Sequence, residues 1–268
     1  MEGKGPQQMA GLATGVSPAA SETVSVGTVS LAESGGAAGA DVGLLHDING
    51  LAKAAPPWFD RIMGFIGEYG IMLGLVVVGL WAWWSLRKRG TAEDSIAGFS
   101  ALVWAPLSAA VALVINIPIR GFVERPRPFV HDKSLEVLVQ GKTDYSFVSD
   151  HSTMAMAIAV GIFLAHRRLG WAALGLAFAE GFLRIYMGVH YPTDVIGGFA
   201  LGTAVTLLLA PLAQLLLTPV TRAIAGSAKG RWMVRSKAAP EDPSTGRSAP
   251  LGIPEPRADG TGEKGLAA

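Results

Sequence analysis

Residues 195–221 read VIGGFALGTAVTLLLAPLAQLLLTPVT, an apolar run without a single charged side chain. A helix rises about 1.5 Å per residue, so a run of this length can cross the roughly 30 Å hydrocarbon core of a bilayer. Two further stretches have the same character, because residues 95–119 carry no charge and residues 62–86 carry only Glu68. These three runs predict three transmembrane helices.

Two weaker patterns lie between residues 95–119 and residues 195–221. Residues 152–165 are apolar but short for a span, and residues 169–189 contain Glu180 and Arg184. Both can cross a membrane if their polar ends lie in a cavity lined by protein rather than in lipid. The chain is therefore predicted to be an all-α integral membrane bundle with about five transmembrane helices.

The two ends of the chain differ from this apolar middle. In residues 41–54 apolar side chains recur at helical spacing among polar ones, which predicts an amphipathic helix lying at the membrane interface. Residues 1–40 are rich in Gly, Ala and Ser, and residues 222–268 mix Pro, Gly and charges without apolar periodicity. Both ends are predicted to be disordered, which leaves residues 41–221 as the membrane-embedded domain.

The composition agrees with a membrane protein. Apolar residues make up 50% of the 268, charged residues make up only 16%, and the mean hydropathy is +0.38. The net charge of +1 lacks the basic excess that a nucleic-acid partner requires. The absence of cysteine excludes disulfides and thiolate metal sites.

The most informative polar stretch is RIYMGVHYPTD, residues 184–194. Arg184 can hold a phosphate, and His190 can attack it. Asp194 follows His190 by four positions, so on one helical turn its carboxylate can accept the Nδ1 proton and leave Nε2 free. Charged groups at the edge of an apolar span are costly, which marks these residues as functional candidates.

Two upstream blocks complete a pattern. RGFVERPRP begins at Arg120 and places Arg127 seven positions later, and FVSDH runs from Phe147 to His151. With the stretch that begins at Arg184, these blocks resemble the type 2 phosphatidic acid phosphatase superfamily, whose pattern is a basic residue, six spacers and Arg-Pro, then Pro-Ser-Gly-His, then Arg, five spacers, His, three spacers and Asp. The second block departs from this pattern at two positions, and its Ser-Asp-His is most similar to the bacterial undecaprenyl-diphosphatase branch.

The resemblance implies a role for each matched residue. It makes His190 the nucleophile, Asp194 its orienting carboxylate, and His151 the group that protonates the leaving oxygen and then activates water. The implied phosphate ligands are the three arginines and the serine of the motifs, namely Arg120, Arg127, Arg184 and Ser149. Because guanidinium groups can stabilise the transition-state charge, neither a metal ion nor an organic cofactor is expected.

Three charged residues keep more than one interpretation. Glu180 lies four positions before Arg184, so it either aims that guanidinium or forms a buried ion pair with it. Asp150 is out of place beside a phosphate and is expected to point away and anchor its loop. Arg125 falls outside the motif spacing and contacts either lipid head groups or the substrate.

The predicted function is hydrolysis of a lipid diphosphate, with undecaprenyl diphosphate as the preferred substrate, through a phosphohistidine. The alternatives are a phosphatase for phosphatidic acid, phosphatidylglycerol phosphate or a decaprenyl-linked sugar phosphate, and a component that binds or transports the lipid diphosphate without hydrolysing it. Basic clusters at residues 87–89 and 167–168 mark one side as cytoplasmic, which places the site on the outer face of the plasma membrane. The sequence leaves the oligomeric state open.

Overall fold

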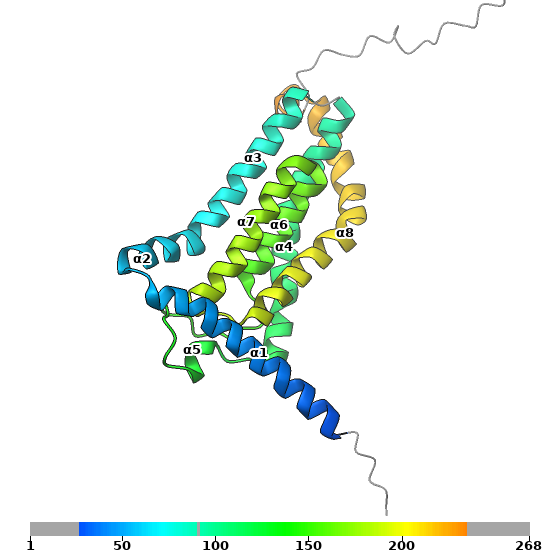
Figure 1. The fold of residues 1–268 in the computed structure, drawn as a ribbon. Coiled ribbons are helices and arrows are strands. Elements are labelled where there is room, and N and C mark those ends of the chain that lie inside the picture. Colours follow the sequence, from blue (N-terminus) through cyan, green and yellow to red (C-terminus); the bar gives the residue numbers. More distant parts are fainter. Residues whose placement is uncertain (1–26, 90–91, 235–268) are drawn as a thin grey trace, which may run out of the picture.

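A computed structural model describes residues 27–89 and 92–234, and all regular structure in this part of the chain is helical. Five long helices, α3 to α8 without the short α5, form the bundle in Figure 1: α3 (Ile71–Arg89), α4 (Ala92–Val123), α6 (Asp150–Ala165), α7 (Arg167–Tyr186) and α8 (Pro192–Gly226). Helix α6 lies at the centre and packs against α4, α7 and α8. The all-α prediction is confirmed.

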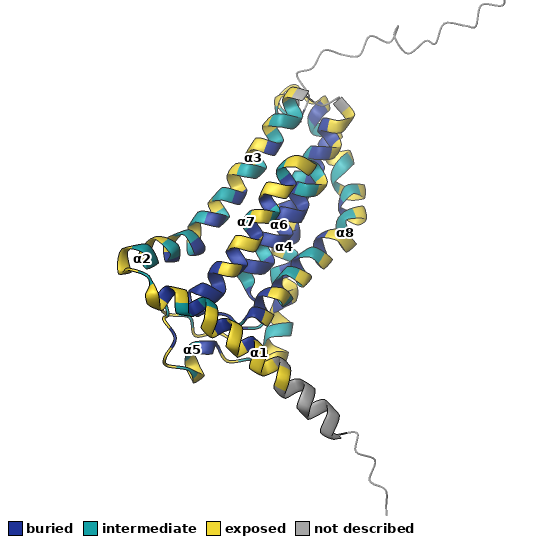
Figure 2. Cartoon of the chain, in the orientation of Figure 1, coloured by how far each residue is buried: buried dark blue, intermediate teal, exposed yellow. Residues whose placement is uncertain are grey.

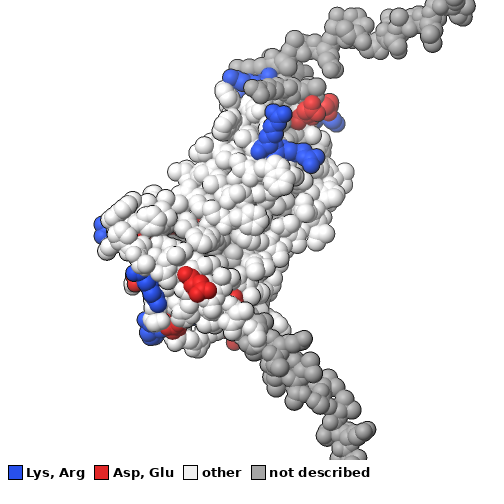
Figure 3. Space-filling view, in the orientation of Figure 1, with Lys and Arg blue, Asp and Glu red and all other residues white. Residues whose placement is uncertain are grey.

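The three long apolar runs form helices as predicted. Among the described residues, Pro57–Lys88, Glu93–His131 and Pro192–Gly226 are long and apolar enough to cross a membrane. Many of their large apolar residues are exposed, among them Leu73, Val77 and Trp81 of α3. Figure 2 colours much of α3 as exposed or intermediate. On the face drawn in Figure 3, uncharged surface separates charged groups at the two ends. This is the distribution of a membrane protein, in which the exposed apolar band meets lipid.

Helix α6 fills the interior of the bundle, and α7 packs beside it with one face on the surface. Helix α6 is apolar but too short to meet the criterion for a span, and that α6 and α7 cross the bilayer stays a prediction. Close packing depends on small residues, because a Cβ at Gly161 of α6 would lie 2.5 Å from the Cβ of Ala105 on α4. Helix α6 is therefore mostly enclosed by its neighbours, whereas α7 also presents Trp171, Phe178 and Phe182 on the outer surface of the bundle.

The first span is built from several helical pieces. Helix α2 (Pro57–Phe65) continues through one turn of π-helix, η1 (Ile66–Gly70), into α3. A π-turn inserts an extra residue into a helix and is frequent at functional sites. Here it carries Glu68, the one charge of the predicted span at residues 62–86.

The structure describes parts of both ends that were predicted to be disordered, residues 27–40 and 222–234, and it places helices there. Helix α1 spans Gly27–Ala54, and its buried Asp41 binds Arg125 at 2.6 Å. Helix α8 reaches Gly226, and α9 (Arg231–Val234) buries Val234 against the bundle. Tertiary contacts thus hold residues 222–234 against the bundle, although this segment lacks its own apolar periodicity. The rest of both predictions, residues 1–26 and 235–268, lies outside the described residues.

The predicted amphipathic helix at residues 41–54 is the second half of α1. It packs against α7 and α8 and lies across one end of the bundle (Figure 1). Leu45 is buried, whereas Leu44 and Leu51 stay exposed, so part of the apolar stripe faces away from the protein. The exposed leucines agree with a helix at the membrane interface.

Candidate functional site

All three sequence blocks lie at the same end of the bundle. Arg120 lies in the last turn of α4 and Arg184 in the last turn of α7. His151 and Asp194 lie in the first turns of α6 and α8. The short helix α5 (Pro128–His131) and the irregular segment 132–149 cover this end (Figure 1). The alternation of up and down helices therefore brings the blocks together, as their order along the chain predicts.

A tight turn between α7 and α8 places His190. Gly188 has a φ of +69°, which favours glycine, and a Cβ there would lie 2.7 Å from the Glu136 carbonyl oxygen. Asp194 then caps α8, because its Oδ2 accepts a hydrogen bond from the Tyr191 backbone N–H at 2.9 Å. The histidine is consequently held between two fixed helix ends.

The contacts of His190 define its tautomer. Its Nδ1 lies 3.6 Å from Asp194 Oδ2, and its Nε2 lies 3.3 Å from Nη1 of Arg127. Arginine has donors only, so Nε2 must be the acceptor, and the ring proton therefore belongs on Nδ1, facing Asp194. Catalytic contacts are often loose without substrate, which fits the 3.6 Å separation. This is the tautomer that leaves the lone pair of Nε2 for attack.

The surroundings of His190 keep it neutral. Burial lowers the pKa of His190 below its ordinary value, and the charges of Arg127 and Arg184 lower it further. Asp194 acts in the opposite direction but does not outweigh them. A neutral imidazole is the form that can act as a nucleophile.

Arg125 has a structural partner on each side. It donates to Asp194 Oδ1 at 2.8 Å and to Asp41 Oδ2 at 2.6 Å, and it stacks on the ring of Tyr191 at 3.8 Å. Asp41 also accepts from the Thr193 N–H at 2.9 Å. Arg125 thus fixes Asp194 from the side opposite His190, a role outside the two that its sequence position suggested.

Arg120 and Arg127 share a carboxylate that the motifs did not mark. Asp144 binds Nη1 of Arg120 at 2.9 Å through Oδ2 and Nη2 of Arg127 at 2.8 Å through Oδ1. Burial raises the pKa of Asp144, but the hydrogen bond and charge of Arg127, with the charge of Arg120, hold it below its ordinary value. An ionised carboxylate therefore lies between two of the arginines predicted to bind phosphate.

Asp150 points into this cluster rather than away from it. Its Oδ1 lies 2.6 Å from Nη2 of Arg120 and accepts a hydrogen bond from Asn116 at 2.7 Å. Asn116 also donates to the Val148 carbonyl at 3.0 Å. Asp150 thus joins the start of α6 to Arg120 and Asn116 of α4, and its expected role as an anchor of the loop stays a prediction.

Arg184 lies between two acidic residues, Glu68 and Glu180. Its Nε lies 3.0 Å from Glu180, its Nη1 donates to Glu68 at 3.1 Å, and its Nη2 donates to the Gly67 carbonyl. Glu180 and Arg184 are both buried and lie within ion-pair distance, and that Glu180 also aims the guanidinium stays a prediction. The π-turn is what brings Gly67 and Glu68 to this arginine.

Glu68 also reaches the two remaining basic groups of the site. Its Oε1 accepts from Lys142 at 2.9 Å and lies 4.0 Å from Nε2 of His151. Sequence reasoning missed Glu68 as a site residue, although an isolated charge in an apolar run is a functional signal in membrane proteins. Lys142 and Asp144 lie in the irregular segment 132–149, where no periodicity marks them.

Ser149 is placed differently from a phosphate ligand. It is fully buried at the N-cap of α6, where its Oγ accepts from Ser152 N at 3.5 Å and from Ser152 Oγ at 3.1 Å. Its own N–H donates to the Asp194 carbonyl at 3.1 Å. Ser149 thus joins the start of α6 to the start of α8, and its predicted contact with phosphate stays a prediction.

Comparison with known proteins gives a consistent result. Residues 101–216, which include all three blocks, match the PAP2 superfamily. The chain is 32% identical over 158 residues to "Undecaprenyl-diphosphatase BcrC" of Bacillus subtilis, covering 59% of this chain and 76% of that protein. It is 28% identical over 164 residues to "Putative undecaprenyl-diphosphatase YbjG" of Escherichia coli, covering 60% of this chain and 77% of that protein.

Other similarities are more distant or shorter. "Phosphatidylglycerophosphatase B" of Bacillus subtilis is 32% identical over 104 residues, which are 33% of this chain and 46% of that protein. The crystal structure of Aquifex aeolicus LpxE superposes with a TM-score of 0.47 at 22% identity, covering 63% of this chain and 94% of that one.

Proposed function

The chain belongs to the PAP2 superfamily and is a membrane lipid phosphatase, and on this premise we propose that it hydrolyses undecaprenyl diphosphate to undecaprenyl phosphate and phosphate. The observation that supports hydrolysis is the position of the His190 ring. Its Nε2 contacts Arg127, and its Nδ1 faces Asp194 on the opposite side. Relatives named undecaprenyl-diphosphatase support the choice of substrate.

The first chemical step follows from these contacts. The terminal phosphate binds Arg120, Arg127 and Arg184, and Arg127 turns from His190 to the phosphate. Nε2 of His190 attacks phosphorus, and the bond from phosphorus to the bridging oxygen breaks as the new P–N bond forms. His151, which takes up a proton as the anionic diphosphate binds beside it, gives this proton to the departing oxygen of the lipid phosphate. Asp194 stabilises the positive charge of the phosphorylated imidazole.

The second step returns the enzyme to its starting state. His151, now neutral, takes a proton from a water molecule, whose oxygen attacks the phosphohistidine. The P–N bond breaks, phosphate leaves, and the electron pair of that bond returns to Nε2 of His190. The arginines stabilise the five-coordinate transition state in both steps, because their charge does not depend on pH.

Glycerolipid phosphates form a second candidate substrate class. The similarity to a phosphatidylglycerophosphatase favours this class, which includes phosphatidylglycerol phosphate and phosphatidic acid. The residues of the site are suited to binding phosphate and include no group that would recognise the lipid tail. They therefore do not distinguish prenyl diphosphates from glycerolipid phosphates. A decaprenyl-linked sugar phosphate is a further candidate substrate that these contacts do not distinguish. A protein that only bound the lipid diphosphate, without hydrolysing it, would need no His190–Asp194 pair.

A substrate panel tests the proposal. Purified protein in detergent with excess EDTA is given undecaprenyl diphosphate, phosphatidylglycerol phosphate, phosphatidic acid and a decaprenyl-linked sugar phosphate, and phosphate release is measured. We expect the highest kcat/KM for the prenyl diphosphate, activity in EDTA, and inhibition by vanadate, which mimics the five-coordinate state. A higher kcat/KM for a glycerolipid would overturn the substrate, and a need for added divalent cation would overturn the metal-free mechanism.

We propose that the site faces the outside of the cell. Arg87, Lys88, Arg167 and Arg168 gather at the opposite end of the bundle, which the positive-inside tendency assigns to the cytoplasm. Single cysteines at Lys133 and Lys229, both exposed, test this in a chain without cysteine. A membrane-impermeant maleimide should label Lys133→Cys but not Lys229→Cys in intact cells, and the reverse pattern would invert the orientation.

A further inference from the structure

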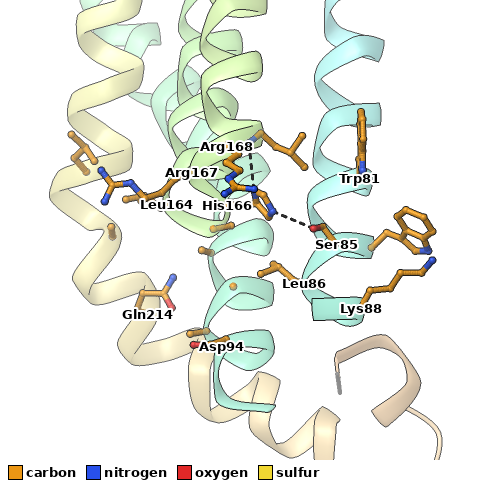
Figure 4. A pocket seen from close by; sticks show the side chains of 18 of the residues that line it. Trp81, Ser85, Leu86, Lys88, Asp94, Leu164, His166, Arg167, Arg168 and Gln214 are labelled. Atoms are coloured by element: carbon orange, nitrogen blue, oxygen red, sulfur yellow. Dashed lines mark hydrogen bonds between the residues drawn. The ribbon is translucent and has the colours of Figure 1, made fainter. Parts of the chain in front are cut away.

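A cavity lies at the end of the bundle opposite His190. It has a volume of about 1200 Å³ and opens between α3, α4, α8 and the junction of α6 with α7. Figure 4 shows His166, Arg167 and Arg168 at that junction, across from Ser85 and Leu86 of α3. None of the residues that line it belongs to the phosphatase site.

Helix α8 explains why space remains here. Pro211 lines the cavity and has no N–H, so it cannot donate to the carbonyl of Leu207, which lines the cavity one turn earlier. Helix α8 bends along its length (Figure 1), as expected for a helix with internal proline. The facing wall on α4 is made of small residues, Ala97, Gly98 and Ala101, which cannot fill the gap.

The rim of the cavity is basic. Lys88, Arg167 and Arg168 line it, against one lining acid, Asp94. Both arginines are exposed, and within the described ranges neither forms a salt bridge. Lys88 lies 3.6 Å above the ring of Trp84, which also lines the cavity.

Basic residues just outside the cavity behave differently. Arg222 is exposed at the same end and binds Glu93 at 3.0 Å. Arg87 stacks between Trp83 and Trp232, at 5.2 Å and 5.7 Å from their ring centres. Arg167 lies 5.7 Å from the ring centre of Phe163, so what distinguishes both rim arginines from Arg222 is that neither forms a salt bridge within the described ranges.

The inner walls are apolar and fit acyl chains. Leu164, Leu169 and Leu207 line the cavity together with Trp81 of α3. Leu164 and Leu207 are 44% and 47% exposed, which is costly in water but favourable against hydrocarbon. Tryptophan is typical of the interface where lipid head groups begin. The cavity therefore combines basic side chains, which suit an anionic head group, with apolar side chains, which suit acyl chains.

We propose that this cavity binds an anionic phospholipid of the leaflet opposite the phosphatase site. Its phosphate pairs with Arg167 and Arg168, which provide planar donors suited to phosphate oxygens. Its acyl chains lie against α8 and the leucines. The hydrogen bond between Ser85 and His166, 3.2 Å long, ties α3 to the α6–α7 junction and fixes the width of the mouth. The proposal is independent of which lipid phosphate the enzyme hydrolyses.

Native mass spectrometry of the delipidated protein in mild detergent tests the proposal. Phosphatidylglycerol is titrated against the wild type, the double variant Arg167→Gln/Arg168→Gln, and Arg222→Gln, a matched control with a basic residue at the same end but outside the cavity. We expect the wild type and the control to hold one more lipid than the double variant, whose affinity at this site falls at least about tenfold. Equal occupancy in all three proteins would overturn the proposal.

Two further arms separate charge from shape. Phosphatidylcholine and glycerol phosphate are titrated in parallel, and each should bind the wild type at least about tenfold more weakly than phosphatidylglycerol, since one lacks net charge and the other lacks tails. Ala210→Trp fills the cavity and leaves every rim charge in place. It should lose the same lipid, and a protein that keeps the lipid with its cavity filled would contradict the assignment even if the arginine variant failed to fold.

Discussion

Replacing Asp144 with asparagine should strengthen substrate binding. The Asp144 carboxylate lies between Arg120 and Arg127, at 2.9 Å and 2.8 Å, where two of the proposed phosphate ligands meet. A phosphate that binds these guanidinium groups must displace it. Asparagine keeps the size of the side chain but removes the charge, so the arginines lose a competitor and stay in place.

The size of the expected change in KM follows from the solvent exposure of the Asp144 ion pairs. The Asp144 side chain is 43% exposed, so each of its two ion pairs is screened by water and contributes about 0.5 to 1 kcal/mol. Together they oppose phosphate binding by about 1 to 2 kcal/mol. At about 1.4 kcal/mol per factor of ten, KM should fall by about 5- to 30-fold. The change in kcat should be small, because Asp144 has no contact with His190 or His151 among the described residues.

The assay is steady-state phosphate release from undecaprenyl diphosphate in mixed micelles. The matched control is Asp132→Asn in the same segment, because Asp132 binds His46 at 2.8 Å and contacts neither arginine. The control should leave KM unchanged. A KM for Asp144→Asn that equals or exceeds the wild-type value would refute displacement and would mean that Asp144 instead holds the arginines in their binding positions.

Three other predictions concern the reacting groups. His190→Ala should abolish turnover while lipid binding, measured by equilibrium titration, stays within about threefold; retained hydrolysis would remove His190 as the nucleophile. The acidic limb of the pH profile of kcat/KM should lie below pH 6.5, because the pKa of His190 is lowered and only its neutral form attacks. Asp194→Asn should move this limb to lower pH, because the Asp194 carboxylate raises the pKa of His190. A limb above pH 6.5 would contradict this. Glu68→Gln should lower kcat about ten- to a hundredfold with a smaller change in KM, since Glu68 positions Arg184; a change confined to KM would make it a binding group.

The sequence was sufficient to predict the features that depend on local composition. Helices without charge, such as residues 195–221, are recognisable because the bilayer requires length and apolarity and little else. The meeting of Arg120, His151 and Arg184 was also predictable, since motifs at alternate helix ends must share one side. The burial of Asp41 was not predictable in this way, because it depends on the contact with Arg125, which lies 84 residues later in the chain.

The acidic residues of the site were harder to find. Asp144 lies in a segment without regular structure, where spacing along the chain carries no information about contacts. Glu68 occupies an apolar run, and only the π-turn directs it to Arg184. Motif reasoning detects residues that contact the substrate and is silent on the groups that neutralise them in its absence.

These acids have a consequence for substrate choice. Guanidinium groups gathered near a membrane repel one another, and the structure balances Arg120 and Arg127 with Asp144 and balances Arg184 with Glu68 and Glu180. A ligand must therefore carry enough charge to replace an internal carboxylate, which favours a diphosphate over a monophosphate. If this is correct, Asp144→Asn should improve kcat/KM more for phosphatidic acid than for undecaprenyl diphosphate, because the monophosphate has less charge with which to compete. An equal gain for both lipids would show that the carboxylate sets affinity without setting selectivity.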